Sequence, residues 1–137
     1  MIIADTGAIV ALIDSSDRHH RALHDLFVSA PEQWVLPCAI LPEVDYLLAE
    51  HVGRKAEELF VEDLSKGAWE IEWGVRNDLV RAQEILERYR SLEVGLVDAI
   101  VIAIAERLGA EAIATLDLRD FGAIDIAGSP RLIPRDL

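Results

Sequence analysis

The chain has 137 residues, enough for one domain, and 25 Asp and Glu against 13 Lys and Arg give it a formal net charge of −12. Hydrophobic residues make up 52% of the chain, so it can bury a sizeable core, and a disordered acidic tail is excluded. A surface this negative repels phosphate backbones at long range, which disfavours a nucleic-acid binder that relies on an ordinary basic patch.

Short apolar runs alternate with stretches of helical spacing along the whole chain. In chain order, the pattern predicts a strand at 2–4, helices at 6–13 and 18–28, a strand at 34–36, helices at 39–51 and 54–64, a strand at 69–73, helices at 78–89 and 96–108, and strands at 112–115 and 131–134. No linker or repeat interrupts this series, so we expect residues 1–137 to form a single domain. Alternating strands and helices imply parallel pairing, and the predicted fold is a three-layer α/β/α sandwich with a central, mostly parallel sheet.

The cysteine content and the N-terminus indicate the compartment. Cys38 is the only cysteine, so it cannot form an intrachain disulfide, and no Cys/His cluster with zinc-binding spacing is present. The first residues lack a basic segment before an apolar one, and the apolar runs are too short to span a bilayer. We therefore expect a cytoplasmic protein without a membrane anchor.

Acidic residues stand where the predicted strands end. Asp5 follows the first strand directly, Glu43 lies in the opening turns of the helix after the second strand, and Asp117 follows the strand at 112–115. In parallel α/β sheets the functional crevice lies outside the carboxyl ends of the strands, so we expect these side chains to approach one another.

Asp98 lies near the start of the most apolar predicted helix. Its neighbours are aliphatic or small, and no Lys or Arg lies within one helical turn of it. A carboxylate in such surroundings costs several kcal/mol unless it is protonated, paired or bound to a cation.

Each acid also has a purely structural interpretation. Asp5 and Asp98 could cap helices, Glu43 could be an ordinary first-turn acid, and Asp117 and Asp120 could cap a turn. These interpretations do not explain why the acids gather at one edge, where their charges repel unless a divalent cation joins them. Oxygen ligands suit Mg²⁺ or Mn²⁺, whose chemistry at such a site is phosphodiester hydrolysis by a metal-activated water.

Four stretches of the sequence resemble the four acidic motifs of PIN-domain ribonucleases. They are residues 3–8, 41–44, 96–99 and 114–121. In length and single-domain build the chain is most similar to the VapC toxins of type II toxin–antitoxin systems, and the resemblance covers essentially the whole chain. It implies a Mg²⁺- or Mn²⁺-dependent endoribonuclease that forms homodimers. It also implies a VapB-type antitoxin that blocks the site, in a heterotetramer or larger assembly.

The resemblance also assigns roles to individual residues. Asp5 and Asp98 would be the principal metal ligands. Glu43 would orient or activate the attacking water, and Asp117 would be the fourth acid, bound through water or to a second ion. Thr115 would orient the site. Asp120 occupies a position at which it either assists or replaces Asp117, and the sequence leaves that choice open.

Other functions compete with this interpretation. A phosphoacceptor receiver domain needs a Lys at a strand end, where neither Lys55 nor Lys66 falls, and an Asp-dependent phosphatase needs a second Asp where this chain has Gly7. A non-catalytic binding or dimerisation module, whose acids are caps, stays open.

The location of the acids changes the meaning of the net charge. If five of the 25 acids share one pocket, a bound cation reverses the sign that RNA meets there. The remaining negative charge predicts a basic protein partner. Arg119, Arg131 and Arg135, near the last predicted elements, are the candidate RNA contacts.

Overall fold

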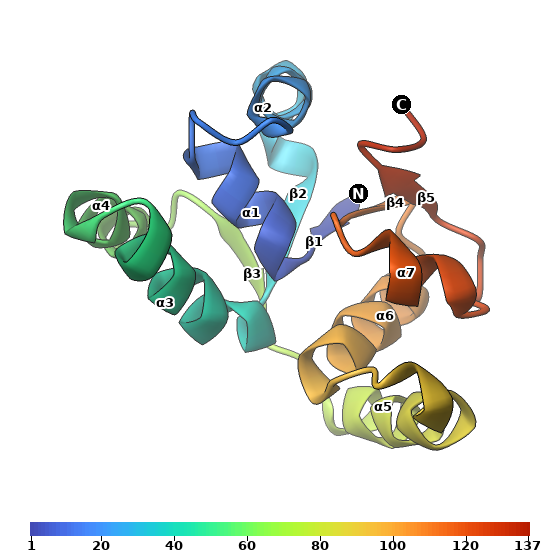
Figure 1. Cartoon of the computed structure of the whole chain (residues 1–137). Helices are drawn as coiled ribbons and strands as arrows, with labels where there is room; N and C mark the ends of the chain where they lie inside the picture. The colour runs from blue at the N-terminus through green and yellow to red at the C-terminus, as the bar shows by residue number, and fades with distance from the viewer.

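A five-stranded parallel sheet runs through the centre of the computed structural model, which describes residues 1–137 (Figure 1). Its spatial order is β3-β2-β1-β4-β5, and every neighbouring pair is parallel. The strands are β1 (Ile2–Ala4), β2 (Trp34–Pro37), β3 (Glu70–Glu72), β4 (Ala112–Ala114) and β5 (Arg131–Ile133). All five predicted strands are confirmed, and β3 and β5 form the two edges of the sheet.

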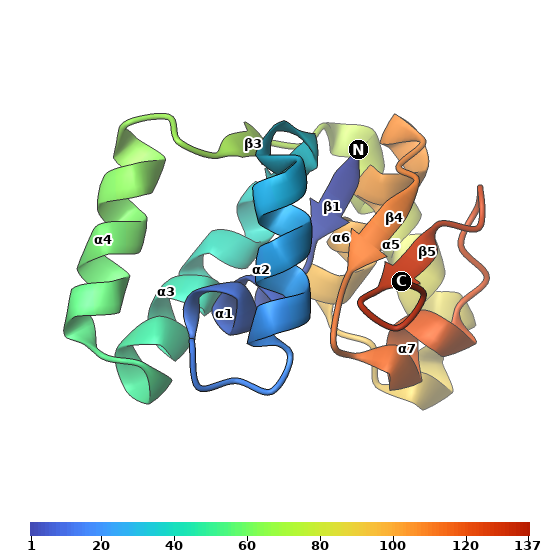
Figure 2. The same cartoon turned by 90° about the horizontal axis from the view of Figure 1, so that it is seen from above.

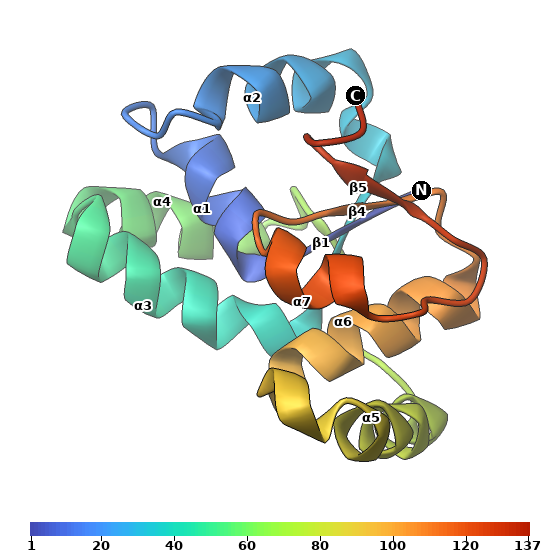
Figure 3. The ribbon, with the colours of Figure 1, turned by 45° about the vertical axis from the view of Figure 1, so that its right-hand side comes forward.

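Seven helices surround this sheet. They are α1 (Thr6–Ile13), α2 (His20–Ser29), α3 (Leu41–His51), α4 (Arg54–Ser65), α5 (Arg76–Arg88), α6 (Leu96–Leu108) and α7 (Leu118–Ala123). Helices α1 and α2 lie on one side of the sheet and α5, α6 and α7 on the other (Figure 3). The α3–α4 pair extends away from the strands (Figure 2). The three-layer sandwich is confirmed, and none of the helices has both the length and the apolar character of a membrane span.

The sequence pattern misplaced or missed some boundaries. Helix α7 was predicted only as a turn, because its six residues are too few to show a helical period. The helix predicted at 18–28 begins at His20, because the Asp17 carboxylate accepts the backbone N–H of His19 and holds the preceding turn. The strand predicted at 69–73 is shorter, and Trp73 beyond its end is 72% exposed.

Two arginines fix the largely apolar helix α6 against its neighbour α5. The Arg107 guanidinium donates to both oxygens of Asp78, at 2.8 and 3.0 Å, and Arg81 donates to both oxygens of Glu106, at 2.7 and 3.1 Å. Asp78 is almost fully buried, so its pair with Arg107 is shielded from solvent on the carboxylate side. Forked Arg–carboxylate pairs are geometrically specific, so they set the position of α6 and of the residues that it carries.

The C-terminal end of α6 requires a residue without a side chain. Gly109 adopts the left-handed conformation, with φ +61°, and so ends the helix. An L side chain at this position is strained. We therefore expect Gly109→Ala to lower the free energy of unfolding by about 1 kcal/mol. Denaturant titration measures it, and Gly122→Ala, in α7 without a positive φ, is the control. Equal effects of the two substitutions would contradict the conformational explanation.

Candidate metal centre

The order in which the chain adds strands to the sheet reverses between β1 and β4, and the crevice lies at this point. From β1 the chain proceeds to β2 and β3 on one side, and it returns to β4 and β5 on the other. The connections that leave the carboxyl ends of β1 and β4 therefore diverge, as at the ligand-binding switch points of other open α/β sheets. Asp5 and Thr115 directly follow these two strands, and the backbone N–H of Asp5 donates to the carbonyl oxygen of Ala114 at 2.8 Å.

Thr115 connects the two strand ends through its hydroxyl group. This side chain is fully buried, and its Oγ1 donates to Oδ2 of Asp5 at 3.0 Å. The same oxygen accepts the backbone N–H of Asp117 at 3.1 Å. Asp5 itself is only 6% exposed. One hydroxyl thus fixes both the Asp5 carboxylate and the start of the loop that carries Asp117.

Three further acids converge next to Asp5. Oxygens of Asp98, Asp117 and Asp120 lie within 4.8 Å of one another, a spacing at which one cation can contact all three. Asp117 is the N-cap of α7, and its Oδ1 accepts the backbone N–H of Asp120 at 3.1 Å. Oδ1 of Asp120 is buried and has no hydrogen-bond partner. A buried oxygen without a donor is costly, and a bound cation would satisfy it.

Glu43 reaches the site from the first turn of α3. Its Oε1 accepts a hydrogen bond from the Thr6 hydroxyl at 2.7 Å, while the rest of the side chain is exposed. Glu43, Asp5 and Asp98 line one groove of about 510 Å³, which Tyr46 borders. The structure therefore brings together all of the acids that the sequence predicted for the site.

The electrostatics of the site show that these acids destabilise one another. Burial raises the pKa of Asp98 to about 7, and the negative charges of Asp5, Asp117, Asp120 and Glu43 add to that shift. Burial also raises the pKa of Asp5, although the hydrogen bond from the Thr115 hydroxyl opposes the change. Desolvation and the charge of Asp117 raise the pKa of Asp120. Ionising the whole cluster at neutral pH is unfavourable without a compensating positive charge.

The only basic side chain among the causes of these shifts is Arg119, whose charge opposes the rise in the pKa of Asp120 without outweighing it. None of the ion pairs in the structure involves Asp5, Glu43, Asp98, Asp117 or Asp120. The structural interpretation as a cap holds for Asp117, but Asp5 makes no capping hydrogen bond, and the N-cap residue of α6 is Gly95, not Asp98. An all-oxygen donor set with an unpartnered buried oxygen fits a hard divalent cation.

This arrangement matches a known family. The family model of the PIN domain matches residues 2–127. The chain belongs to the PIN domain family. The family assignment argues against the receiver and phosphatase alternatives, since the match extends over all of the acidic motifs.

Similar proteins cover nearly the whole of this PIN domain. It is 32% identical over 130 residues to Ribonuclease VapC26 of Mycobacterium tuberculosis, across 95% of this chain and 96% of that protein. The crystal structure of Mycobacterium tuberculosis VapC20, a Sarcin-Ricin loop cleaving toxin, is similar with a TM-score of 0.78 and 22% identity, across 93% of this chain and 98% of that one. A toxin–antitoxin complex from Klebsiella pneumoniae is similar with a TM-score of 0.69 and 20% identity, across 97% and 96%. These two structural likenesses establish a shared fold.

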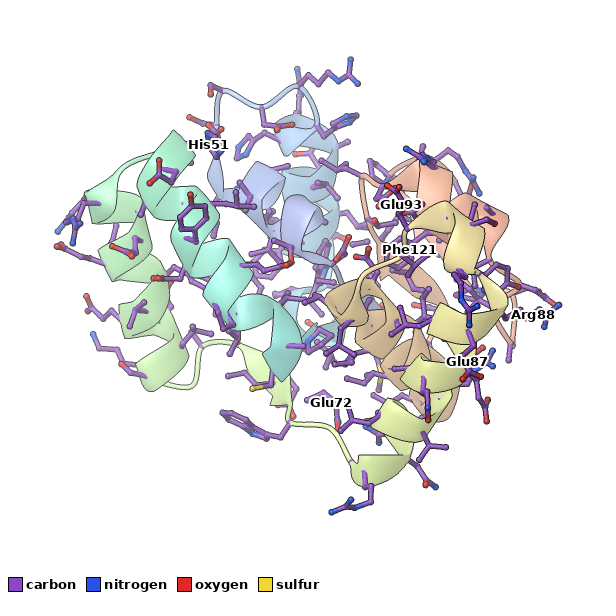
Figure 4. All side chains as sticks on the ribbon, turned by 60° about the horizontal axis from the view of Figure 1, so that its bottom comes forward. His51, Glu72, Glu87, Arg88, Glu93 and Phe121 are labelled. Atoms are coloured by element: carbon purple, nitrogen blue, oxygen red, sulfur yellow. The ribbon has the colours of Figure 1, made fainter.

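Two residues next to the acidic site, Thr6 and Glu93, were not predicted from the sequence. The hydrogen bond between Thr6 and Glu43 joins residues 37 positions apart in the sequence. The only nearby sequence feature that points to it is a hydroxyl residue directly after Asp5. Glu93, labelled in Figure 4, lies close enough to Asp120 of α7 for its charge to contribute to the raised pKa of that residue. Glu93 has a left-handed backbone, with φ +57°, in a loop whose course the sequence pattern did not predict.

Removing the Thr115 hydroxyl tests its positioning role. We expect Thr115→Val to lower the affinity for Mn²⁺ by about 10- to 100-fold, because the Asp5 carboxylate loses the donor that orients it. Isothermal titration calorimetry measures the affinity. Thr115→Ser retains the hydroxyl and should bind Mn²⁺ like the unmodified protein. Unchanged affinity in the Val variant would show that Asp5 needs no such support.

Proposed function

We propose that this PIN domain is the toxin of a type II toxin–antitoxin pair and a Mg²⁺- or Mn²⁺-dependent endoribonuclease. The observation that carries the proposal is the cluster of Asp98, Asp117 and Asp120 oxygens within 4.8 Å of one another, beside the buried Asp5. The relative VapC26 is named a ribonuclease, and VapC20 is described as a Sarcin-Ricin loop cleaving toxin. Both descriptions support the same activity here.

The proposed roles follow from the contacts of each acid. Asp5 and Asp98 are the principal cation ligands, and the Thr115 hydroxyl fixes the orientation of Asp5. Asp117 and Asp120 complete the acidic set, and both lie close enough to Asp98 to share one ion with it. A bound Mg²⁺ or Mn²⁺ supplies a Lewis acid that activates water and neutralises charge on the phosphodiester.

Glu43 is the proposed proton acceptor. The Thr6 hydroxyl holds one of its oxygens at 2.7 Å, so the carboxylate has a defined position in the groove that Asp5 and Asp98 also line. Its other oxygen is free to accept the proton of an attacking water. Attack in line with the leaving oxygen then produces a 5′-phosphate and a 3′-hydroxyl end.

The proposed partners are an RNA substrate, a second copy of the chain and a VapB-type antitoxin. The similar Klebsiella pneumoniae structure is a toxin–antitoxin complex, which supports the antitoxin. The net charge of −12 favours a basic protein partner. A homodimer that joins antitoxins in a heterotetramer or larger assembly is part of the proposal and rests on the family.

Removing and restoring the metal tests the proposed activity. Purified protein is incubated with total RNA in Mg²⁺ or Mn²⁺, with excess chelator, and with chelator followed by an excess of metal. We expect new 5′-phosphate ends in the first and third conditions only. The Glu43→Gln variant, which retains an oxygen to accept the Thr6 hydrogen bond, should cleave far more slowly. Equal cleavage in all conditions would exclude metal-dependent hydrolysis by this site.

A further inference from the structure

A second hollow, with the opposite charge, adjoins the acidic site. It measures about 350 Å³, lies between the α1–α2 loop and the segment after β5, and includes Arg18, His19 and Arg135 in its lining. We call it the basic cleft. No carboxylate lines it, although acids outnumber basic residues 25 to 13 in the chain. The loop and the segment both lie at the end of the molecule where the strands terminate, the lower end in Figure 2.

Thr115 connects the basic cleft to the acids. It lines the cleft, and its hydroxyl donates to Asp5 at 3.0 Å. Leu116 and Leu118, on either side of Asp117, also line the cleft and give it an apolar wall. The segment from Thr115 to Leu118 thus separates the basic cleft from the acids by the width of one chain, so a ligand in the cleft lies close to the acidic site.

The two arginines of the basic cleft differ in how much of their hydrogen-bonding capacity is used. The exposed Arg18 donates from Nε to Nε2 of His19 at 3.2 Å and forms no ion pair, so its terminal N–H groups are free. Arg135 donates to Asp136 through Nε and Nη2, at 2.7 and 2.9 Å, which leaves Nη1. A guanidinium with free terminal groups matches the geometry of a phosphate.

We propose that the basic cleft binds a backbone phosphate of the substrate RNA next to the phosphodiester that is cleaved, with Arg18 as the main contact and Arg135 as the second. This proposal rests on the proposed function. RNA fits better than an acidic peptide, because a polynucleotide has phosphates at regular intervals and can place one at the cation and the next at the arginines. The apolar wall of Leu116 and Leu118 suits the base or ribose between them.

The experiment measures cleavage of a mixed-sequence single-stranded RNA oligonucleotide in Mg²⁺. We expect Arg18→Ala to raise KM about tenfold, the loss of one charge-assisted hydrogen bond, with a far smaller effect on kcat. The slope of log(1/KM) against log salt concentration should fall in magnitude by about 0.7, the value for one phosphate contact on a single strand. Arg135→Ala should have a smaller effect, because Asp136 already occupies one edge of that guanidinium.

Arg88→Ala is the matched control. Arg88 is exposed, forms no ion pair and lies at the end of α5 (Figure 4), where its guanidinium is 5.3 Å from the centre of the Tyr89 ring. The control loses the same charge, so it should leave KM and the salt slope close to those of the unmodified protein. An equal rise of KM in Arg18→Ala and Arg88→Ala, or no rise in either, would overturn the proposal.

Two further outcomes separate the proposal from its rival and from the proposed function. Polyglutamate is tested as a competitor. If the cleft is a site for an acidic peptide, polyglutamate binds in a way that depends on Arg18, while Arg18→Ala leaves RNA cleavage unchanged. That result also overturns the proposal. If the unmodified protein cleaves no RNA, the proposed function fails. Fluorescence anisotropy then measures binding of the same oligonucleotide without cleavage and so tests the basic cleft separately. Equal affinities of the Arg18→Ala and Arg88→Ala variants would show that the cleft does not bind RNA.

Discussion

Replacement of Asp5 by Asn is expected to reduce RNA cleavage in Mg²⁺ by about a thousand-fold or more, because the site loses a negatively charged oxygen where the cation is held. We expect the substitution to preserve the fold. Asn has the same shape, its carbonyl oxygen can still accept the Thr115 hydrogen bond, and the repulsion from Asp117 and Glu43 disappears. The readout is the rate of appearance of new RNA ends.

Asp63→Asn is the control for this prediction. Asp63 is an exposed acid of α4, a helix that lies away from the groove, so its loss should leave the rate unchanged. Circular dichroism confirms that both variants are folded. A folded Asp5→Asn variant that cleaves RNA as fast as the control would remove the acidic cluster from the mechanism.

Without divalent cations, the protein is expected to lose stability as the pH rises from about 4 to about 7. The pKa of Asp98 is about 7 in the folded chain, against an ordinary value of 3.8, so between these values only the folded state retains the proton. The stability that this proton confers is therefore fully present below the pKa of the unfolded chain, and it is lost as the pH rises through the pKa of the folded chain. We expect a decrease of about 2 kcal/mol, which allows for the solvent contact of this half-buried carboxyl group.

The Asp98→Asn variant isolates this effect. It cannot ionise, so between pH 4 and pH 8 it should retain about 2 kcal/mol of stability that the unmodified protein loses. Adding Mn²⁺ at pH 8 should stabilise the unmodified protein far more than the variant. Denaturant titrations at the two pH values provide both comparisons. Identical pH profiles for the two proteins would show that Asp98 does not carry the cost of the assembled acids.

The sheet and its long helices were predictable because local signals are strong there. The apolar run at 2–4 and the almost wholly apolar stretch at 96–108 have only one reasonable place, next to other apolar elements, and the structure confirms both. Helix α7 was not predictable, because it has too few residues for a period. Its start depends on one hydrogen bond from the backbone of Asp120 to Asp117.

The acids of the site were predictable from their position after strands, and their contacts were not. Parallel pairing alone places Asp5 and Asp117 at the same edge. By contrast, Arg18 comes from a loop, and no pattern in the sequence indicates that this loop reaches the segment that carries Arg135. Arg131, predicted beside Arg135 as an RNA contact, pairs with Ala112 at the far end of its strand, away from the cleft.

The register of β1 makes the site more sensitive to insertions and deletions than to substitutions. Ala4 lies opposite Ala114, so the residues that follow them, Asp5 and Thr115, emerge side by side. Successive residues of a strand point to opposite faces, so one residue added to or removed from β1 or β4 would turn one partner away from the other. Chains that diverge from this one should therefore vary in the length of the loops around the sheet, while the spacing from β1 to its acid stays constant.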